Sequence, residues 1–342
     1  MKLTFETIQL TPKYVFRTAR TTSATSDSVV VRLEGDGYTG IGEAAPSRFY
    51  GETAETVTRF LEALRPRIEH CAHESEVMAE LTSRGGTNNP AARAGLEIAA
   101  HDIIGQRFHR PVYQLFGLDP VDLPETVMSI GLDEPDVMLA KAREASGFRT
   151  LKIKLDSDTD LEIVRDIKES TGAAITVDAN CAWSPVEAIE KIKVLTDIGV
   201  EFVEQPVGAG DIDGLRLVRR HADVPIFADE SCPTSADIRQ VVDAVDGIVI
   251  KLMKCGGLVE AVRMARMARD QGLSTMVGCM MESSLAITAA AHIAPLMDWA
   301  DLDSGLLLAD DPFVGVGIDQ GRMDLPTAPG LGVRPAAGPS GG

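Results

Sequence analysis

The chain has 342 residues, of which 44% are hydrophobic, 25% charged and 5% aromatic, a length that suits one large domain or two ordinary ones. Lys and Arg total 33 against 51 Asp and Glu, and the net charge of −18 disfavours nucleic acid and anionic membranes as partners. The opening residues MKLTFETIQL lack the apolar stretch of a signal peptide, and no apolar run is long enough to span a bilayer, which predicts a cytoplasmic protein.

Residues 1–123 carry a mixed pattern that predicts an α+β domain. Two alternating apolar runs, at 28–32 and 39–43, flank a Gly-Asp-Gly turn, which is the signal of a β-hairpin. Apolar residues at helical spacing follow at 53–68 and 91–108.

From residue 124 to 310, short β-branched runs alternate with helical stretches. The expected strands are 126–130, 150–155, 175–179, 202–205, 226–229, 247–252, 274–279 and 299–303. Eight strand–helix units in sequence predict a (β/α) barrel. Because the span is short for a complete barrel, we expect one outer helix to be missing and the N-terminal domain to cover the gap. The composition of the last residues, PAAGPSGG, predicts a disordered tail from about residue 335.

Charged and polar side chains recur at the carboxyl ends of these strands, the face where barrel enzymes build their active sites. They are Lys152 and Lys154, Asp178 and Asn180, Glu204, Asp229, Lys251, and Asp301 and Asp303. Barrel strands are covered on both sides, so a charge on one is costly unless it is paired or binds a metal. Each residue alone has a structural explanation, such as capping the next helix, but their recurrence at one end favours an active site.

Asp178, Glu204 and Asp229 come from three consecutive strands and are expected to converge. Oxygen ligands without a nearby histidine favour a hard divalent cation, with Mg²⁺ ahead of Mn²⁺. We expect one ion per subunit, with open coordination positions for a substrate carboxylate.

The lysines suggest proton transfer. Lys152 and Lys154 are two residues apart on one strand and therefore face the same side, while Lys251 arrives from the far side of the ring. Mutual repulsion and burial would both lower the pKa values of Lys152 and Lys154, which predicts that one of these two can be a neutral amine near neutral pH. Two lysines across a metal-bound carboxylate predict proton removal at an α-carbon on one face and return on the other. The Lys152 ammonium would help to stabilise the enolate between them.

The motifs LKIKL, VDAN, VEQP, FADES and IKLMKCGG, in this order and spacing, resemble the enolase superfamily in its muconate-lactonising-enzyme-like branch. Residues 91–118 are similar to the last helix of that branch's capping domain, and PGLGV from Pro329 to its C-terminal segment. The resemblance implies an enolase-type modified TIM barrel, (β/α)7β, at 124–310, with an N-terminal α+β capping domain at 1–123. Residues 311–342 would return to the cap.

The resemblance also implies roles for individual residues. Asp178, Glu204 and Asp229 would be the metal ligands, and Lys154 and Lys251 the acid/base pair. Asn180 and Glu230 would lie behind the ligands and support them, whereas Lys254 falls outside the pattern. Lys152, Asp301, Asp303, Arg17 and Arg20 would contact substrate.

Members of this branch catalyse several reactions, and the fold cannot choose among them. In the dipeptide epimerases, two aspartates at the eighth strand receive the α-ammonium of the substrate, and Asp301 and Asp303 match them. The implied function is an Mg²⁺-dependent epimerase that inverts the α-carbon of a dipeptide's C-terminal residue. An o-succinylbenzoate synthase or N-acylamino acid racemase remains an alternative, as does a barrel that binds a ligand without turnover.

The preferred dipeptide stays open. The Ala-Glu epimerases carry an arginine after the first strand that meets the glutamate side chain, and here Arg17 and Arg20 are nearby, with Arg20 one residue out of register. Their Thr- and Ser-rich surroundings, residues 18–28, predict a mobile loop over the substrate. Whether the chain forms a homo-oligomer is open as well.

Overall fold

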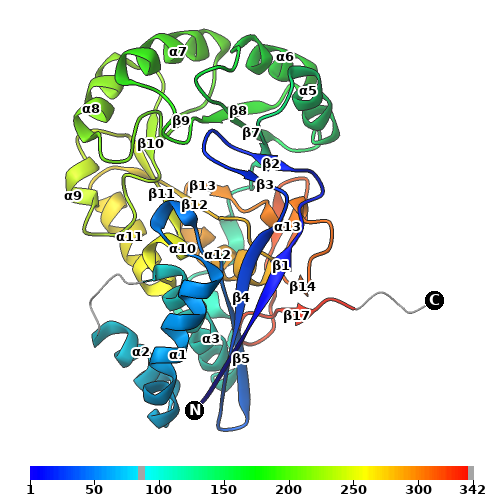
Figure 1. Ribbon diagram of the computed structural model, residues 1–342, viewed down its shortest axis with the longest axis vertical. Coiled ribbons are helices and arrows are strands. Elements are labelled where there is room, and N and C mark those ends of the chain that lie inside the picture. The colour runs from blue at the N-terminus through cyan, green and yellow to red at the C-terminus, as the bar shows by residue number, and fades with distance from the viewer. Residues whose placement is uncertain (84–88, 338–342) are drawn as a thin grey trace.

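The computed structural model in Figure 1 describes residues 1–83 and 89–337. A three-stranded antiparallel sheet with its helices packs beside a ring of eight parallel strands surrounded by helices. The predicted barrel with an N-terminal α+β domain is therefore confirmed.

The N-terminal domain is built from one sheet, in the order β1-β4-β5, and the helices that cover it. Its elements are β1 (Lys2–Leu10), β2 (Phe16–Arg17), β3 (Thr22–Ser23), β4 (Ser26–Gly35), β5 (Tyr38–Ala44), α1 (Ala54–His70), α2 (Glu74–Ser83), α3 (Pro90–Arg107) and α4 (Val112–Leu115). The hairpin expected around the Gly-Asp-Gly turn is the β4–β5 pair, and the two expected helices are α1 and α3.

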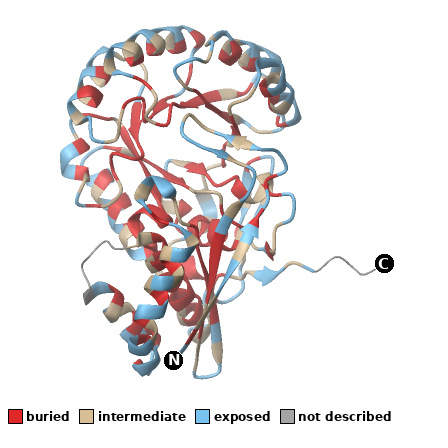
Figure 2. Ribbon diagram, viewed as in Figure 1, coloured by how far each residue is buried: buried red, intermediate tan, exposed pale blue. Residues whose placement is uncertain are grey.

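Helix α3 lies directly on β5 because two glycines leave room for its backbone. A Cβ added at Gly40 would lie 2.0 Å from the carbonyl oxygen of Ala99, and one at Gly42 would lie 2.0 Å from that of Gly95. Both contacts are far too short for any side chain larger than hydrogen. Figure 2 shows buried residues along α3 and along the middle of β4.

The barrel strands run in sequence order around the ring, from β6 to β13. They are β6 (Met128–Ile130), β7 (Thr150–Lys154), β8 (Ala174–Asp178), β9 (Val203–Glu204), β10 (Ile226–Ala228), β11 (Gly247–Lys251), β12 (Ser274–Gly278) and β13 (Trp299–Asp301). Thr126 forms a parallel bridge with Ala300, and the Val127 N–H donates to the Ala300 carbonyl at 2.9 Å. This bridge brings the first strand against the last, so that side chains at the strand ends meet.

Helices cover the outside of the ring. They are α5 (Pro135–Glu144), α6 (Glu162–Thr171), α7 (Pro185–Ile198), α8 (Ile212–His221), α9 (Ile238–Val241), α10 (Leu252–Cys255), α11 (Leu258–Asp270), α12 (Ser284–Ala291) and α13 (Ser304–Leu307). The single turn α13 is all that follows β13 directly, which agrees with the expected missing helix. Local signals set the boundaries: α7, for example, begins with a Ser184–Glu187 capping box and ends at Gly199, whose φ is +81°.

The C-terminal segment forms short strands rather than a tail from residue 335. They are β14 (Phe313–Val314), β15 (Gly317–Asp319), β16 (Arg322–Asp324) and β17 (Arg334–Pro335). The tail prediction is wrong at its start, because β17 pairs with β14 and the Ala336 N–H donates to the Pro312 carbonyl at 2.9 Å. The rest of the predicted tail, 338–342, lies outside the described residues. The segment does return to the N-terminal domain, where the Leu331 N–H donates to Asp102 of α3 at 2.8 Å.

None of the helices in the described part of the chain combines the length and the apolar character that crossing a bilayer requires.

Candidate active site

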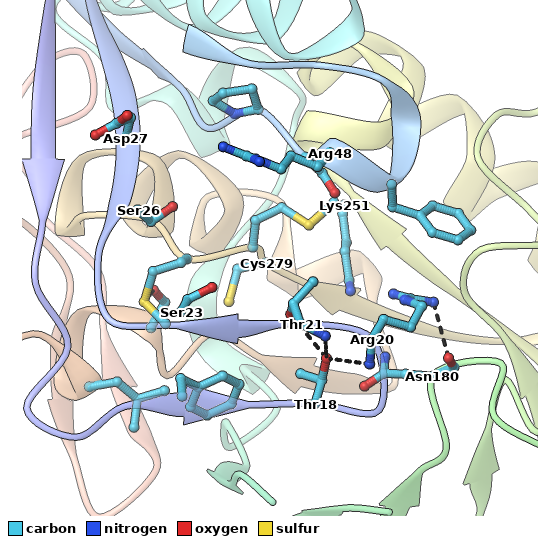
Figure 3. Close-up of a pocket in the computed structure, with 18 of the residues that line it drawn as sticks. Thr18, Arg20, Thr21, Ser23, Ser26, Asp27, Arg48, Asn180, Lys251 and Cys279 are labelled. Carbon is cyan, nitrogen blue, oxygen red and sulfur yellow. Dashed lines mark hydrogen bonds between the residues drawn. The ribbon is translucent and has the colours of Figure 1, made fainter. Parts of the chain in front are cut away.

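A cavity of about 410 Å³ lies where the carboxyl ends of the barrel strands face the N-terminal domain. Figure 3 shows its lining, with Lys251 rising from the barrel and Arg20 and Arg48 coming from the other domain. The predicted site residues that line it are Arg20, Lys154, Asn180, Lys251, Asp301 and Asp303. The strand-end pattern thus brings residues from β7, β8, β11 and β13 into one space.

Lys152 is the centre of the charged cluster beneath this cavity. Its side chain is 1% exposed, and its Nζ lies 2.8 Å from Glu204, 2.8 Å from Asp301 and 3.3 Å from Asp178. Burial by itself lowers the pKa of Lys152, but the three carboxylates outweigh burial and raise it well above the ordinary lysine value. Lys152 is therefore an ammonium ion in this arrangement.

Lys154 and Lys251 line the cavity and form ion pairs with different carboxylates. Lys154 Nζ donates to Asp178 at 2.5 Å, and Lys251 Nζ donates to Asp229 at 2.7 Å. Burial lowers the pKa of Lys251, but the charges of Asp229 and Glu204 raise it above the ordinary value. The expectation of a depressed pKa is wrong for Lys152, because carboxylates and not the neighbouring lysine are its nearest charges.

The three predicted metal ligands are fully buried at the ends of β8, β9 and β10. Among the residues that the structure describes, Glu204 Oε1 has no hydrogen-bonding partner, and Oε2 has only the ion pair with Lys152. Burial and the neighbouring Asp178 raise the pKa of Glu204 to about 8. A bound cation would satisfy such an unpartnered, buried carboxylate oxygen, so the donor set fits a hard divalent ion by its chemistry.

The three carboxylates pair with lysines rather than with one another. Within residues 1–83 and 89–337, no three acidic, thiol or imidazole groups are grouped closely enough to hold a metal ion. Lysine ammonium groups contact each of the three carboxylates instead.

Lys254 and Gln205 form hydrogen bonds with Asp229. The sequence did not predict a role for either residue. Lys254 is fully buried and donates to the Asp229 carboxylate at 2.7 Å and to its carbonyl at 2.6 Å. Gln205, which lies within the VEQP motif, accepts from the Asp229 N–H at 2.9 Å and from the Ser231 N–H at 3.1 Å. A polar side chain in each motif was the available signal, but its partner lies more than 20 residues away.

Asn180 and Glu230 lie behind the carboxylates. The Asn180 N–H and Nδ2 donate to Asp178 at 2.8 and 3.1 Å. Its φ of +44° is unusual for a residue other than glycine, and Cys181 and Gln205 also have positive φ. Strained backbone of this kind concentrates at functional sites. Glu230 is buried and forms an ion pair with Arg20.

Asp301 and Asp303 differ in their partners. Asp301 pairs with Lys152, whereas Asp303 accepts the Ser129 N–H at 2.5 Å and forms no ion pair with any described residue. Burial and the charge of Asp301 raise the pKa of Asp303 to about 6. Asp303 is therefore a buried carboxyl group at the cavity, and none of the described lysines or arginines pairs with it.

The structure separates the two candidate arginines. Arg20 lines the cavity, but Arg17 does not, and its nearest carboxylate is Asp133 at 3.9 Å. The predicted loop around them contains the short β2–β3 hairpin. Its mobility stays a prediction.

Comparisons with known proteins identify the family. Residues 4–117 match the mandelate racemase / muconate lactonizing enzyme N-terminal domain, and residues 137–338 match the enolase C-terminal domain-like family. An L-Ala-D/L-Glu epimerase from Bacteroides thetaiotaomicron is 38% identical over 335 residues, which cover 97% of this chain and 88% of that protein.

Two solved structures share the fold over almost the whole chain. A dipeptide epimerase from Enterococcus faecalis, complexed with Mg and the dipeptide L-Leu-L-Tyr, has a TM-score of 0.91 and 36% identity over 97% of this chain and 98% of its own. An N-succinyl Arg/Lys racemase from Bacillus cereus has a TM-score of 0.92 and 28% identity over 98% of this chain and 96% of its own. With both of its domains matched, the chain belongs to the enolase superfamily and is an isomerase of the mandelate racemase / muconate lactonizing enzyme branch.

Proposed function

We propose that the enzyme is an Mg²⁺-dependent dipeptide epimerase that inverts the α-carbon of the dipeptide's C-terminal residue. Asp303 carries the proposal, because it is a buried carboxyl group at the cavity without a cationic partner among the described residues. The free α-ammonium of a dipeptide would supply that cation. Similar proteins named for dipeptide epimerisation support the same substrate class.

Lys154 and Lys251 would move the proton. They stand at the ends of β7 and β11, which have three strands between them in either direction around the eight-stranded ring. A substrate α-carbon held between them would lose its proton to one lysine and regain a proton from the other. Transfer from opposite faces inverts the configuration.

Asp178, Glu204 and Asp229 would hold the Mg²⁺ ion, and the buried Oε1 of Glu204, which has no partner among the described residues, supports this assignment. When bound, such an ion would offset the negative charge that develops on the substrate carboxylate as the α-proton leaves. Lys152 would add a fixed positive charge on the same side, since its ammonium already contacts Asp178 and Glu204.

The N-acylamino acid racemases are the second candidate function, because the N-succinyl Arg/Lys racemase shares the fold at 28% identity. The same lysines would serve this reaction. An acylated amino group carries no positive charge, however, and would leave Asp303 without a partner. The same objection applies to the substrate of an o-succinylbenzoate synthase.

Solvent exchange tests the function. The enzyme is incubated with Mg²⁺ in deuterated water with a library of L,L-dipeptides and, separately, with N-acetyl and N-succinyl amino acids. We expect one deuterium at the α-carbon of the C-terminal residue of a dipeptide, by mass spectrometry, together with the D configuration by chiral chromatography. No exchange in any dipeptide, or faster exchange in the acylated amino acids, would contradict the proposal.

A further inference from the structure

Three arginines lie near the mouth of the cavity, and they differ in their partners. Arg17 is 3.9 Å from Asp133 and does not line the cavity, whereas Arg20 lines it and is paired with Glu230. Arg48 also lines the cavity and forms no ion pair with a described residue. Figure 3 shows Arg20 reaching from the turn beside Thr18 and Thr21 toward Asn180.

The β2–β3 hairpin is anchored to the barrel through the end of β2. The Leu132 N–H donates to the Arg17 carbonyl at 2.9 Å, which ties β2 to the loop after β6. The turn itself is ordered by Thr18, whose Oγ1 accepts from the backbone N–H groups of Arg20 at 3.3 Å and Thr21 at 3.2 Å. The backbone thus presents Arg20 in a defined position.

Arg20 anchors the tip of the same hairpin to different barrel loops. Its Nη1 forms an ion pair with Glu230, after β10, and donates to the Asn180 carbonyl, after β8, at 3.2 Å. Its guanidinium also lies 4.3 Å from the centre of the Phe49 ring, which belongs to the N-terminal domain. The hairpin is therefore held to the loops after β6, β8 and β10, on two sides of the barrel mouth.

We propose that Arg20 acts as a latch, which holds the β2–β3 hairpin across the cavity. It does not bind an acidic side chain of the substrate. The Glu230 side chain is only 2% exposed. If Arg20 turned to a substrate carboxylate, it would leave a buried anion unpaired, which is unfavourable. The inference rests on the proposed function, since the substrate enclosed is a dipeptide, and Arg20 would act through the hairpin as a positioning residue.

Substrate selectivity distinguishes a latch role of Arg20 from direct binding of an acidic substrate side chain by Arg20. In the R20M variant, kcat/KM for L-Ala-L-Glu and for its neutral isostere L-Ala-L-Gln should fall by the same factor. We expect a loss of about tenfold to a hundredfold, the scale on which misplacement of a positioning element acts. A loss confined to L-Ala-L-Glu would overturn the proposal, because only a residue that meets the carboxylate would distinguish the two.

Limited trypsin digestion tests the latch without any substrate. Cleavage between Arg17 and Thr18, measured by mass spectrometry, should be faster in R20M than in the wild-type enzyme. The matched control is R48M, which removes the other arginine of the cavity lining and should leave this cleavage rate unchanged. An unchanged rate in R20M would overturn the proposal. If no dipeptide is turned over, the proposed function fails while this digestion still decides the latch.

The variant R20M/E230Q covers the case in which R20M does not fold. It removes both charges, so that no buried carboxylate is left unpaired. In a double-mutant cycle, R20K should retain slow cleavage, and E230Q and R20M/E230Q should both be cleaved faster than the wild type without their effects adding. Additive effects of the two substitutions would show that Arg20 and Glu230 act independently, which overturns the proposal.

Discussion

Lys254 clamps Asp229 from the turn of helix that follows β11. Its Nζ donates to the Asp229 carboxylate and carbonyl, and also to the carbonyl oxygens of Val249 at 2.8 Å and Cys232 at 3.3 Å. The other carboxylate oxygen of Asp229 accepts from Lys251 at 2.7 Å. Asp229 is thus held between two lysines, only one of which lines the cavity.

Removal of this clamp should weaken metal binding. K254M keeps most of the side-chain volume but leaves the Asp229 carboxylate free to turn, and we expect Mg²⁺ affinity to fall by about 10- to 100-fold, as for other residues that orient metal ligands. Isothermal titration calorimetry measures this directly. The control is K168M, whose lysine also donates to two backbone carbonyl groups, those of Ile198 and Gly199, but does not line the cavity. A folded K254M with wild-type affinity would show that Lys254 does not position Asp229.

Protonation of Asp303 should lower kcat/KM at acidic pH. Its pKa of about 6 means that it is protonated below that pH, when it can no longer receive an ammonium group. Asp301, Lys152 and Cys279 are the other titratable groups nearest to it. For a dipeptide, kcat/KM should therefore fall about tenfold per unit as the pH drops below 6. The D303N variant should be much less active, and its kcat/KM should not show this fall below pH 6. If the fall persists in D303N, another group causes it.

The barrel could be predicted from sequence because its strands are short apolar runs with charges at one end. The expected strand 150–155 is β7 at 150–154, and the expected 226–229 is β10 at 226–228. In a parallel ring the carboxyl ends meet, so that Asp178 and Glu204, two strands' final residues, are register neighbours. Periodicity and topology together were sufficient for these residues.

The contacts of residues that lie outside the barrel strands could not be predicted. Lys254 follows Lys251 by three positions, a spacing that faces away on a strand, but the chain turns into α10 there and brings Lys254 back onto Asp229. The pairing of Arg20 with Glu230 joins loops 210 positions apart. The lysine pKa values depended on which carboxylates turned toward them, which residue spacing does not determine.

Glu97 should make stability depend on pH. It extends from α3 and accepts from the Val259 N–H at 2.8 Å at the start of α11, and burial raises its pKa to about 7. Because the folded state binds this proton more tightly than the unfolded state does, the contribution of Glu97 to stability decreases as the pH rises from about 4.5 to 7.

The E97Q variant removes that dependence while keeping an acceptor for Val259. Its free energy of unfolding at pH 8 should exceed that of the wild type by up to roughly 3 kcal/mol, which corresponds to a pKa raised from 4.5 to about 7. The gain should disappear near pH 4.5. Chemical denaturation at both values checks this, with E190Q on the exposed face of α7 as the control for loss of a charge. An E97Q variant less stable than the wild type at pH 8 would refute it.

Hydrogen exchange in single-lysine variants tests most directly whether Lys154 and Lys251 are two bases on opposite sides of the substrate. K154A and K251A are each incubated with the L,L and L,D forms of a dipeptide substrate in deuterated water with Mg²⁺. Both variants should lose epimerisation, yet each should still exchange the α-hydrogen of one configuration, and the configuration should differ between the two variants. Loss of exchange of both configurations in one variant with full exchange in the other would indicate a single base, and epimerisation retained in both would contradict a role for either lysine.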